Sequence, residues 1–324
     1  MNRNQIGALL RGPLAPLAGL ALVIVIFTVW GALQKPDVAF MSGFRLSMIA
    51  KQTAIVGMGA VGMTAVIAAG GIDLSVGSLL ALCSVVLASV MHSGADPATA
   101  VLAALLVGAA AGALNGKLIT LLKLAPFVVT LGTMLIYRGL AEQVSSQLTV
   151  RAEAPRWIAA LLEPVATSNA PLVSWGVWIV IGAACMLSFV LRRSVFGRHV
   201  TAVGANENAA RLCGVPIRST KILVYAIAGF CTAMAGIFEF ANLGSQGSPS
   251  SGVGWELEVI AAVVIGGGSL SGGRGSVFGS LIGATMMTTL RSGCVYVEIP
   301  DPVQKVVTGA IILAAVALDR SRAR

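Results

Sequence analysis

The chain has 324 residues, of which 56% are hydrophobic and only 11% are charged. Soluble globular domains carry about 25% charged residues, so this composition excludes a soluble domain and indicates an integral membrane protein with several spans. The formal net charge of +9 does not indicate nucleic-acid binding, because only 6% of the residues are aromatic and the Lys and Arg residues lie in short loops and at the tail.

Apolar stretches long enough to cross a bilayer follow one another along the chain. About twenty apolar residues span the hydrocarbon core as a helix. By this measure the sequence predicts helices near residues 14–33, 52–70, 74–91, 98–121, 125–143, 173–191, 219–242, 255–268, 273–290 and 303–319. We expect one all-α polytopic membrane domain over residues 1–324 with about ten spans, or nine if the short eighth helix is discounted. Five spans precede a long loop at 144–172 and five follow it, which is typical of an inverted repeat.

One break between these helices stands out, the segment from Gly70 to Gly77, because residues 54–69 before it and 76–91 after it carry no charge. Glycine adopts the left-handed conformation without a Cβ penalty, so Gly70 is expected to end one helix. Asp73 and Ser75 are expected to accept hydrogen bonds from the first free N–H groups of the next helix. The segment is therefore predicted to be a capped turn at a membrane face, where the Asp73 carboxylate need not be buried.

Two predicted helices carry glycine at every fourth residue, which places the glycines on one helix face. They are Gly108, Gly112 and Gly116 in one helix, and Gly275, Gly279 and Gly283 in another. Small residues let helix backbones approach closely in lipid, so we expect tight packing at both faces.

The basic residues predict which helix ends face the cytoplasm. With ten spans and a cytoplasmic N-terminus, the C-terminus is cytoplasmic too, and most Lys and Arg residues fall on that side, as the positive-inside rule requires. The minority on the outer side are Lys35, Arg45, Lys51, Arg138, Arg151, Arg156, Arg291 and Lys305. This topology places the Asp73 turn, the loop at 192–221 and the glycine run at 267–275 on the cytoplasmic side.

The predicted cytoplasmic loop at 192–221 is the best candidate for a partner site. Asn206 is placed to cap a short helix that ends at Gly214, with Glu207 near its positive end and Arg211 near its negative end. A short, capped, exposed helix with an alanine-rich face suits docking into a groove on another protein. An ordinary basic cytoplasmic loop is the alternative interpretation.

The remaining polar residues do not form a catalytic, nucleotide or metal site in the sequence. The stretch from Leu270 to Arg274 looks like an ABC ATPase signature, but the chain lacks a phosphate loop of the form GxxxxGK[ST], so we expect no nucleotide there. His92 and His199 fall on opposite sides of the membrane, and the five cysteines are scattered singly.

Several polar residues near predicted helix ends are interpreted as interfacial residues rather than ligands. They are Asn115, Arg138, Glu239, Glu256 and Glu258. The predicted helix centres show none of the acidic and basic pairs of a proton-coupled carrier, which favours a transporter energised from outside the chain.

Four stretches in this order resemble the permease subunits of bacterial ABC sugar importers, the ribose-type branch of the family shared with branched-chain amino-acid permeases. They are Gly70 to Leu82; Asn115-Gly116 with Lys123 to Thr133 and Arg138 to Ala141; Gly197-Arg198 with Ala202 to Gly204 and Asn206 to Gly214; and Glu256 to Gly267 with Gly272, Gly273 and Gly275. The chain departs from the family pattern at Ala125, where proline is frequent, and at Ala205, where glycine is frequent.

The resemblance implies an import permease for a monosaccharide or polyol that works by alternating access in the bacterial inner membrane. Besides membrane lipid, it implies a cytoplasmic ABC ATPase that uses ATP, a second identical or related permease chain, and a periplasmic sugar-binding protein. No cofactor, metal or catalytic residue is expected on this chain.

The resemblance also implies two functional segments, and it assigns no residue to the substrate. The coupling segment at 204–214 would contact the ATPase through Gly204, Asn206, Glu207, Ala209, Ala210, Arg211 and Gly214. The hallmark turn comprises Gly70, Gly71, Asp73, Ser75 and Gly77.

Three other hypotheses remain open: a permease for a branched-chain amino acid or nucleoside, an ion-coupled carrier, and a membrane-embedded enzyme. Uptake of a panel of labelled solutes distinguishes the first hypothesis from a sugar permease. Uptake that persists after the proton and sodium gradients collapse excludes the second. The third needs a clustered catalytic set within one leaflet, and the sequence offers none.

Overall fold

The regular structure of the chain is almost entirely helical. The computed structural model describes residues 15–34, 39–163 and 173–323, so Lys35 and the predicted loop residues 164–172 lie outside the described residues. The helices are α2 (Ala15–Gln34), α3 (Gly43–Ala68), α4 (Val76–His92), α5 (Pro97–Leu122), α6 (Pro126–Val144), α7 (Arg156–Ala159), α8 (Trp175–Arg193), α9 (Val195–Ala205), α10 (Glu207–Leu212), α11 (Ile217–Asn242), α12 (Trp255–Ile265), α13 (Val277–Tyr296) and α14 (Asp301–Ala323). Two short strands, β1 (Val150–Arg151) and β2 (Gln246–Gly247), pair antiparallel.

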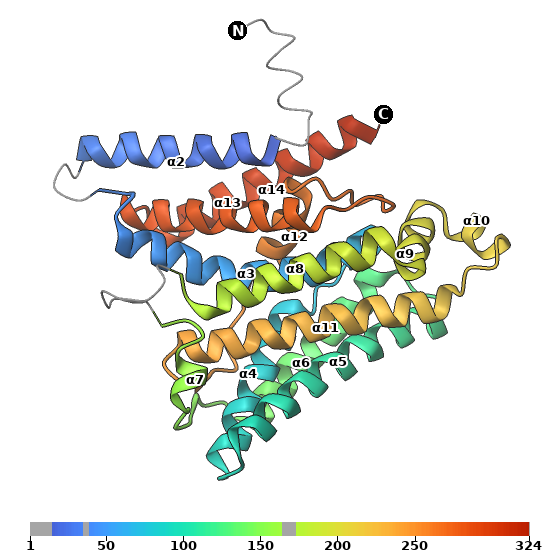
Figure 1. Ribbon diagram of the computed structural model, residues 1–324, viewed down its shortest axis with the longest axis horizontal. Coiled ribbons are helices and arrows are strands. Elements are labelled where there is room, and N and C mark those ends of the chain that lie inside the picture. Colours follow the sequence, from blue (N-terminus) through green and yellow to red (C-terminus); the bar gives the residue numbers. More distant parts are fainter. Residues whose placement is uncertain (1–14, 35–38, 164–172, 324) are drawn as a thin grey trace, which may run out of the picture.

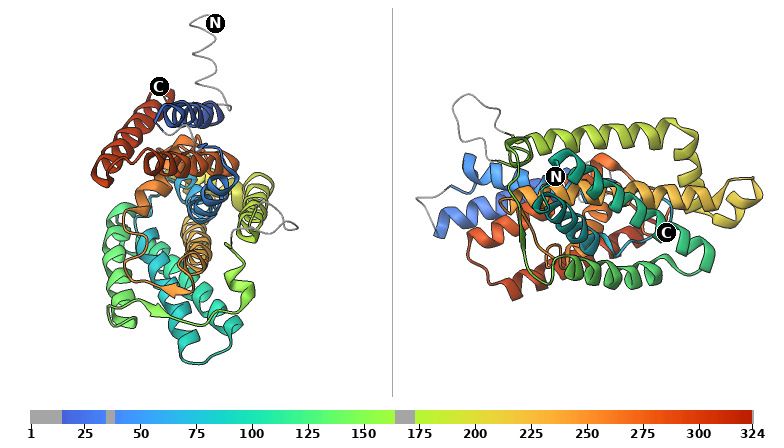
Figure 2. Two further views of the ribbon diagram at one scale, coloured as in Figure 1. Left: turned by 90° about the vertical axis from the view of Figure 1, so that its left-hand side faces the viewer. Right: turned by 90° about the horizontal axis from the view of Figure 1, so that it is seen from below.

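Each of the ten predicted helices overlaps a helix of the structure, which confirms the all-α fold, although α3 begins nine residues before its predicted start at residue 52. The long helices run roughly parallel in one bundle, with α9 and α10 at one end (Figure 1). Seen along the helices, α2, α13 and α14 lie on one side and α4, α5 and α6 on the other (Figure 2). Among the described helices, five are long and apolar enough to cross a membrane, namely α2, α3, α5, α8 and α11. Ten full crossings therefore stay a prediction.

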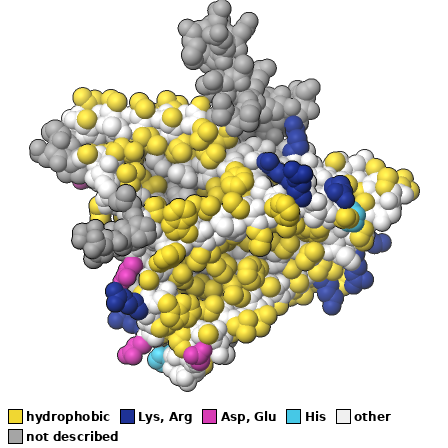
Figure 3. Space-filling view, in the orientation of Figure 1, with side chains coloured by type: hydrophobic (Ala, Val, Ile, Leu, Met, Phe, Trp, Pro, Cys, Tyr) yellow, Lys and Arg dark blue, Asp and Glu magenta, His cyan; other side chains and the backbone are white. Residues whose placement is uncertain are grey.

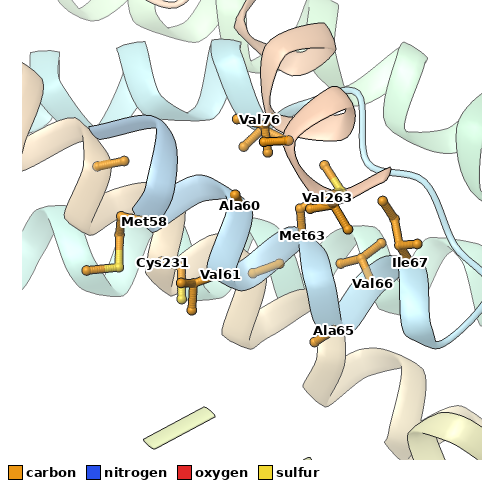
Figure 4. Packing of buried hydrophobic residues seen from close by; sticks show 14 of the residues in the cluster. Met58, Ala60, Val61, Met63, Ala65, Val66, Ile67, Val76, Cys231 and Val263 are labelled. Carbon is orange, nitrogen blue, oxygen red and sulfur yellow. The ribbon is translucent and has the colours of Figure 1, made fainter. Parts of the chain in front are cut away.

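Helix α3 lies at the centre of this bundle. All of its residues from Ala54 to Ala68 are buried. A helix that is apolar all round must be surrounded by other helices, and α3 packs against α8, α11, α12 and α13. The close view shows Met58 and Val61 beside Cys231 of α11, and Met63 near Val263 of α12 (Figure 4).

The predicted glycine faces pack as expected. A Cβ atom added at Gly112 of α5 would overlap the backbone oxygen of Tyr225 in α11, and one added at Gly283 of α13 would overlap the backbone oxygen of Ala262 in α12. Backbone therefore packs directly on backbone at both contacts, as small residues permit in a membrane bundle. Gly275 lies just before α13 rather than within it.

Helix α12 begins inside the bundle and not at its end. It has 11 residues, so it rises about 16 Å, roughly half of the hydrocarbon core. A Cβ at Gly247 would contact the Ser84 backbone in the middle of α4, whereas one at Gly252 would contact the backbone of Gly77 in its first turn. The segment 247–254 therefore descends along α4 before α12 starts. The helix predicted at 255–268 is shorter than expected, because it ends at Ile265.

In both halves of the chain a long helix is followed by a shorter one. Helices α3 and α11 each have 26 residues, and each is followed by a non-helical segment and a shorter helix, α4 with 17 residues and α12 with 11. This agreement supports the inverted repeat, which stays a prediction.

The outer surface of the bundle is apolar along its flank. In the space-filling view, hydrophobic side chains cover the helices along their length, and Lys and Arg residues gather towards the ends (Figure 3). Such a band with charged ends is the surface expected of a bundle surrounded by lipid.

Candidate functional site

The short helix predicted in the loop at 192–221 is present as α10. Asn206 caps it, because its Oδ1 accepts a hydrogen bond from the backbone N–H of Ala209 at 3.0 Å. Gly214 adopts φ +79° just beyond the helix end, a conformation that favours glycine. The predicted capping and the predicted end of this helix are both confirmed. A longer helix that the sequence did not predict, α9, precedes it.

Ion pairs fix α10 on the end of the bundle. Glu207 accepts hydrogen bonds from Arg211 within α10 at 3.1 Å and from Lys221 in α11 at 2.6 Å. Arg211 is exposed and the Lys221 side chain is largely buried, so the second pair contributes more to holding α10 in place.

The predicted coupling residues divide into two groups. Asn206, Ala209, Arg211 and Gly214 are exposed, whereas Ala210 is only 5% exposed and faces the protein. The sequence prediction passed over Leu212, which is the most exposed large hydrophobic residue of the described chain at 90%. The surface that α10 offers to a partner therefore includes an apolar side chain beside polar ones.

Gly204 packs against other parts of this chain on one side. A Cβ added there would overlap the backbone of Ala68 at the end of α3, and the N–H of Gly273 donates to the same Ala68 oxygen at 3.0 Å. Gly70 and Gly272 also lie against Gly204. We call this meeting of α9, the hallmark turn and the glycine run the glycine junction. The interpretation of Gly204 as an ATPase-facing residue stays a prediction; the side of its backbone that a Cβ would occupy packs against Ala68.

The hallmark turn at 70–77 is more deeply buried than expected. Asp73 is only 3% exposed, and its Oδ1 accepts two hydrogen bonds from Ser75, from the backbone N–H at 2.8 Å and from the hydroxyl at 2.6 Å. Ser75 makes no side-chain capping bond to α4. The predicted capping by Asp73 and Ser75 is therefore wrong in detail, because Asp73 fixes Ser75 itself and does not bind the free N–H groups of the helix.

A buried hydrogen-bond network extends from this turn to three other helices. The Asn115 side-chain amide of α5 donates to the Ser75 hydroxyl at 2.9 Å, and the Tyr137 hydroxyl of α6 donates to the Asn115 oxygen at 2.9 Å. The Tyr225 hydroxyl of α11 donates to the backbone oxygen of Ile72 at 3.3 Å. Asn115 is fully buried, so its interpretation as an interfacial residue is wrong. A satisfied buried network specifies one geometry for the turn.

Arg138 is a half-buried residue of α6, and its guanidinium donates to the backbone oxygens of Pro249 and Ser251. These carbonyls belong to the segment that descends along α4. Arg138 thus fixes that segment and does not lie free at a membrane surface.

A basic groove lies beside α10. It has a volume of about 650 Å³ between α10, the start of α11 and the turn from α5 to α6. Four cationic residues line it, with Glu207 as the one acidic residue; these are Lys123, Arg211, Arg218 and Lys221. This end of the bundle is suited to an acidic surface.

A polar cavity of about 550 Å³ lies towards the opposite end, between α3, α11, α12 and α13. Its polar lining comprises Arg45, Gln52, Glu239, Asn242, Ser250, Glu258, Thr288, Arg291 and Ser292, together with the aromatic residues Phe44 and Trp255. The sequence interpretation missed this site because its members come from four helices and one loop without any shared spacing.

Two of the glutamates interpreted as interfacial residues therefore line one cavity. Glu258 pairs with Arg291 at 3.4 Å, and Glu239 accepts a hydrogen bond from Asn242 at 3.4 Å. The Arg291 side chain is 60% exposed and both residues lie near helix ends, so the expectation that no helix centre carries an acidic and basic pair stays a prediction. Within the residues that the structure describes, no group of three His, Cys, Asp or Glu residues is placed to hold a metal ion.

Comparison with known proteins covers nearly the whole chain. Residues 45–316 match the family model described as branched-chain amino acid transport system / permease component. The chain is 36% identical to the ribose import permease protein RbsC of Bacillus subtilis, over 95% of this chain and 93% of that protein. It is 34% identical to the D-allose transport system permease protein AlsC of Escherichia coli (93% and 89% covered) and 37% identical to the fructose import permease protein FrcC of Rhizobium meliloti (87% and 79% covered). No solved structure matches the chain significantly.

Proposed function

We propose that this chain, which belongs to the branched-chain amino acid transport system / permease component family, is the membrane permease of an ATP-driven importer for a monosaccharide. The observation that carries the proposal is its similarity along almost the whole chain to permeases named for ribose, allose and fructose. The chain binds no nucleotide itself in this proposal; a separate ATPase supplies the energy and a binding protein delivers the sugar.

Uptake by cells that carry the complete importer tests this function. We expect labelled ribose, allose or fructose to enter, and leucine and a nucleoside to stay outside. Uptake of leucine alone would overturn the sugar proposal and favour the amino acid that the family description names.

The Glu258–Arg291 pair in the cavity lining makes an ion-coupled carrier the second candidate, because acidic and basic pairs occur in proton pathways. Ionophores separate the two energy sources. We expect uptake to persist when the proton and sodium gradients collapse while ATP remains. Loss of uptake under those conditions at unchanged ATP would favour the carrier.

The exposed face of α10 is the proposed binding surface for the ATPase. Its support is geometric: α10 projects at one end of the bundle, carries the exposed Leu212, and is tied to α11 through Glu207 and Lys221. A movement of α10 is transmitted to α11 by that ion pair and to α3 by the glycine junction. Reorientation of the bundle between two states would follow, as alternating access requires.

A matched pair of variants tests this ATPase-binding surface. Leu212→Glu places a charge on the most exposed apolar side chain of α10, and Thr201→Glu places the same charge on an exposed position of α9. We expect Leu212→Glu to abolish copurification of the ATPase that accompanies the wild-type chain, and Thr201→Glu to retain it. Equal copurification of both variants would contradict the assignment.

The proposed orientation places α10 and both termini in the cytoplasm of a bacterium, with the chain in the inner membrane and a second permease chain beside it. The native cysteines offer a test, because Cys213 is exposed just after α10 while Cys185, also exposed, lies in the middle of α8. We expect a membrane-impermeant maleimide to label Cys213 in inside-out vesicles and to leave it unlabelled in spheroplasts. The reverse pattern would invert the topology.

A further inference from the structure

We infer that the polar cavity between α3, α11, α12 and α13 is the place where a monosaccharide contacts this permease. The inference rests on the proposed function, and it assigns substrate contacts to residues that neither the sequence nor the family description assigns. Its evidence is the charge balance of the cavity, the chemistry of its lining and its position in the bundle.

The charge balance distinguishes this cavity from two others on the molecule. Its lining carries two arginines, Arg45 and Arg291, and two glutamates, Glu239 and Glu258. The basic groove carries four cations and one carboxylate, and an apolar groove between α3, α8 and α11 has no charged lining residue. A neutral solute that needs many hydrogen bonds fits a balanced cavity better than either groove. A pocket lined by Arg151 and Glu153 is balanced as well, but it is formed by the end of α4 and the loops around β1 and β2.

Two of the four charged side chains of the cavity pair with each other, whereas the buried Nε of Arg45 has no hydrogen-bond partner among the described residues. Glu258 pairs with Arg291, and Glu239 accepts a hydrogen bond from Asn242. The cavity also offers neutral polar groups.

Those neutral groups match the hydroxyl groups of a sugar. Gln52, Asn242 and Ser292 supply donors and acceptors from three different helices, and none of the three is fully buried. Phe44, which is 73% exposed, contributes an aromatic surface on which the C–H face of a pyranose or furanose can pack. Small-molecule sites commonly combine an apolar wall with a few placed polar groups.

The cavity reaches from the end opposite α10 towards the interior of the bundle. Arg45, near the start of α3, and Trp255, at the start of the half-length helix α12, both line it. Gly252 also lines the cavity, and it packs directly against Gly77 of the hallmark turn. A solute entering from the outer face thus stops where the descending segment 247–254 meets α4. The hallmark turn supports the inner end of the cavity.

The first test removes neutral hydrogen-bonding groups. In the complete importer with a sugar-loaded binding protein, we expect Gln52→Ala and Asn242→Ala each to lower monosaccharide uptake about three- to tenfold, as loss of one or two hydrogen bonds predicts. ATP hydrolysis stimulated by the binding protein should stay within about twofold of wild type, because neither residue lies near α10. Gln143→Ala, on an exposed position of α6, is the matched control and should leave uptake unchanged.

The second test does not depend on transport. Ser292→Cys, in a chain whose exposed Cys185 and Cys213 are replaced by serine, places a thiol in the cavity lining. We expect a membrane-impermeant maleimide to label this thiol from outside, and the transported sugar with its binding protein to slow labelling, whereas leucine does not.

The outcomes separate this inference from the function on which it rests. If the wild-type importer transports none of the monosaccharides, the proposed function fails. If it transports a sugar, yet the two alanine variants behave as wild type and Ser292→Cys is labelled equally with and without that sugar, the cavity assignment alone is overturned.

Discussion

The two ends of the bundle are built from different chemistry. At the α10 end, a short helix projects, Leu212 is exposed, and four cations surround a single carboxylate. At the other end, a concave cavity balances two arginines against two glutamates and offers neutral polar groups. A projecting, charged, partly apolar surface suits a protein partner, whereas a charge-balanced hollow suits a small neutral solute. In the proposed function, energy input and substrate handling are therefore assigned to opposite ends of one chain.

The region between the two ends is apolar and closely packed. Helix α3 is buried over most of its length, and glycines bring α5 onto α11 and α12 onto α13. The two ends are therefore joined by elements that have little room to deform separately. Substitutions at this connection and at α10 test how far each end depends on it.

The largest effect is expected at the glycine junction. Gly204→Val puts a branched side chain where even a Cβ overlaps the Ala68 backbone, so α9 must separate from α3. We expect a loss of about 3 kcal/mol in the free energy of unfolding, near the upper end for overpacking, together with loss of transport. Thermal unfolding of the detergent-purified chain measures it.

Gly132 is the control for that substitution. A Cβ at Gly132 of α6 meets nothing within 4 Å, so Gly132→Ala should be neutral or raise stability by up to about 1 kcal/mol. If Gly204→Val unfolds at the same temperature as Gly132→Ala, the two ends are not joined through the junction.

The second effect is expected at the hallmark turn. Asp73→Ala leaves the buried Ser75 N–H and hydroxyl without their acceptor, which should cost about 1–3 kcal/mol in unfolding free energy and reduce transport. Asp73→Asn keeps a carbonyl oxygen at the same place and should retain most of both. Should the Asn variant fold stably but fail in transport, the carboxylate charge itself is required, and the turn is more than a structural support.

A smaller effect is expected at the cap of α10. Asn206→Ala removes the acceptor for the Ala209 N–H and should destabilise this helix by about 1 kcal/mol. Hydrogen exchange should rise at the amides of α10 and stay unchanged in α3. Asn206→Ser is the rescue variant. Faster exchange throughout α3 would show that the ends are coupled more tightly than the packing indicates.

The smallest effect is expected from the ion pairs on α10. Glu207→Gln weakens the attraction to Arg211 and Lys221, and partly exposed pairs of this kind contribute about 0.2–1 kcal/mol. The loss should show as weaker ATPase copurification at low salt and vanish at high salt, where the pairs are screened. Salt-independent weakening would mean that Glu207 contacts the partner directly.

Local signals in the sequence predicted the helices and the α10 motif well. Apolar length located ten helices, and the spacing from Asn206 to Gly214 gave both the cap and the end of α10. The glycine face from Gly108 to Gly116 likewise identified the contact with α11. In each case the deciding interactions join residues close in sequence or repeat along one helix.

Contacts between distant segments were not predictable in this way. Asn115 looked interfacial because it lies near a helix end, but its partners Ser75 and Tyr137 come from other helices. Glu258 looked terminal because nothing in its neighbourhood shows that α12 starts inside the bundle. Gly204 looked like part of an exposed motif, although one side of its backbone packs against Ala68. Burial of these residues depends on how the helices are arranged, and no local pattern encodes that.

The continuity of α3 has a mechanical consequence. This helix runs without a break for 26 residues, about 39 Å, from the Ala68 contact with α9 to residues that line the polar cavity. At Ala68 the contact is backbone against backbone, so no flexible side chain can absorb a displacement. A displacement of α9 would therefore be transmitted along α3 towards Gln52 and Arg45, which line the cavity near the other end of this helix.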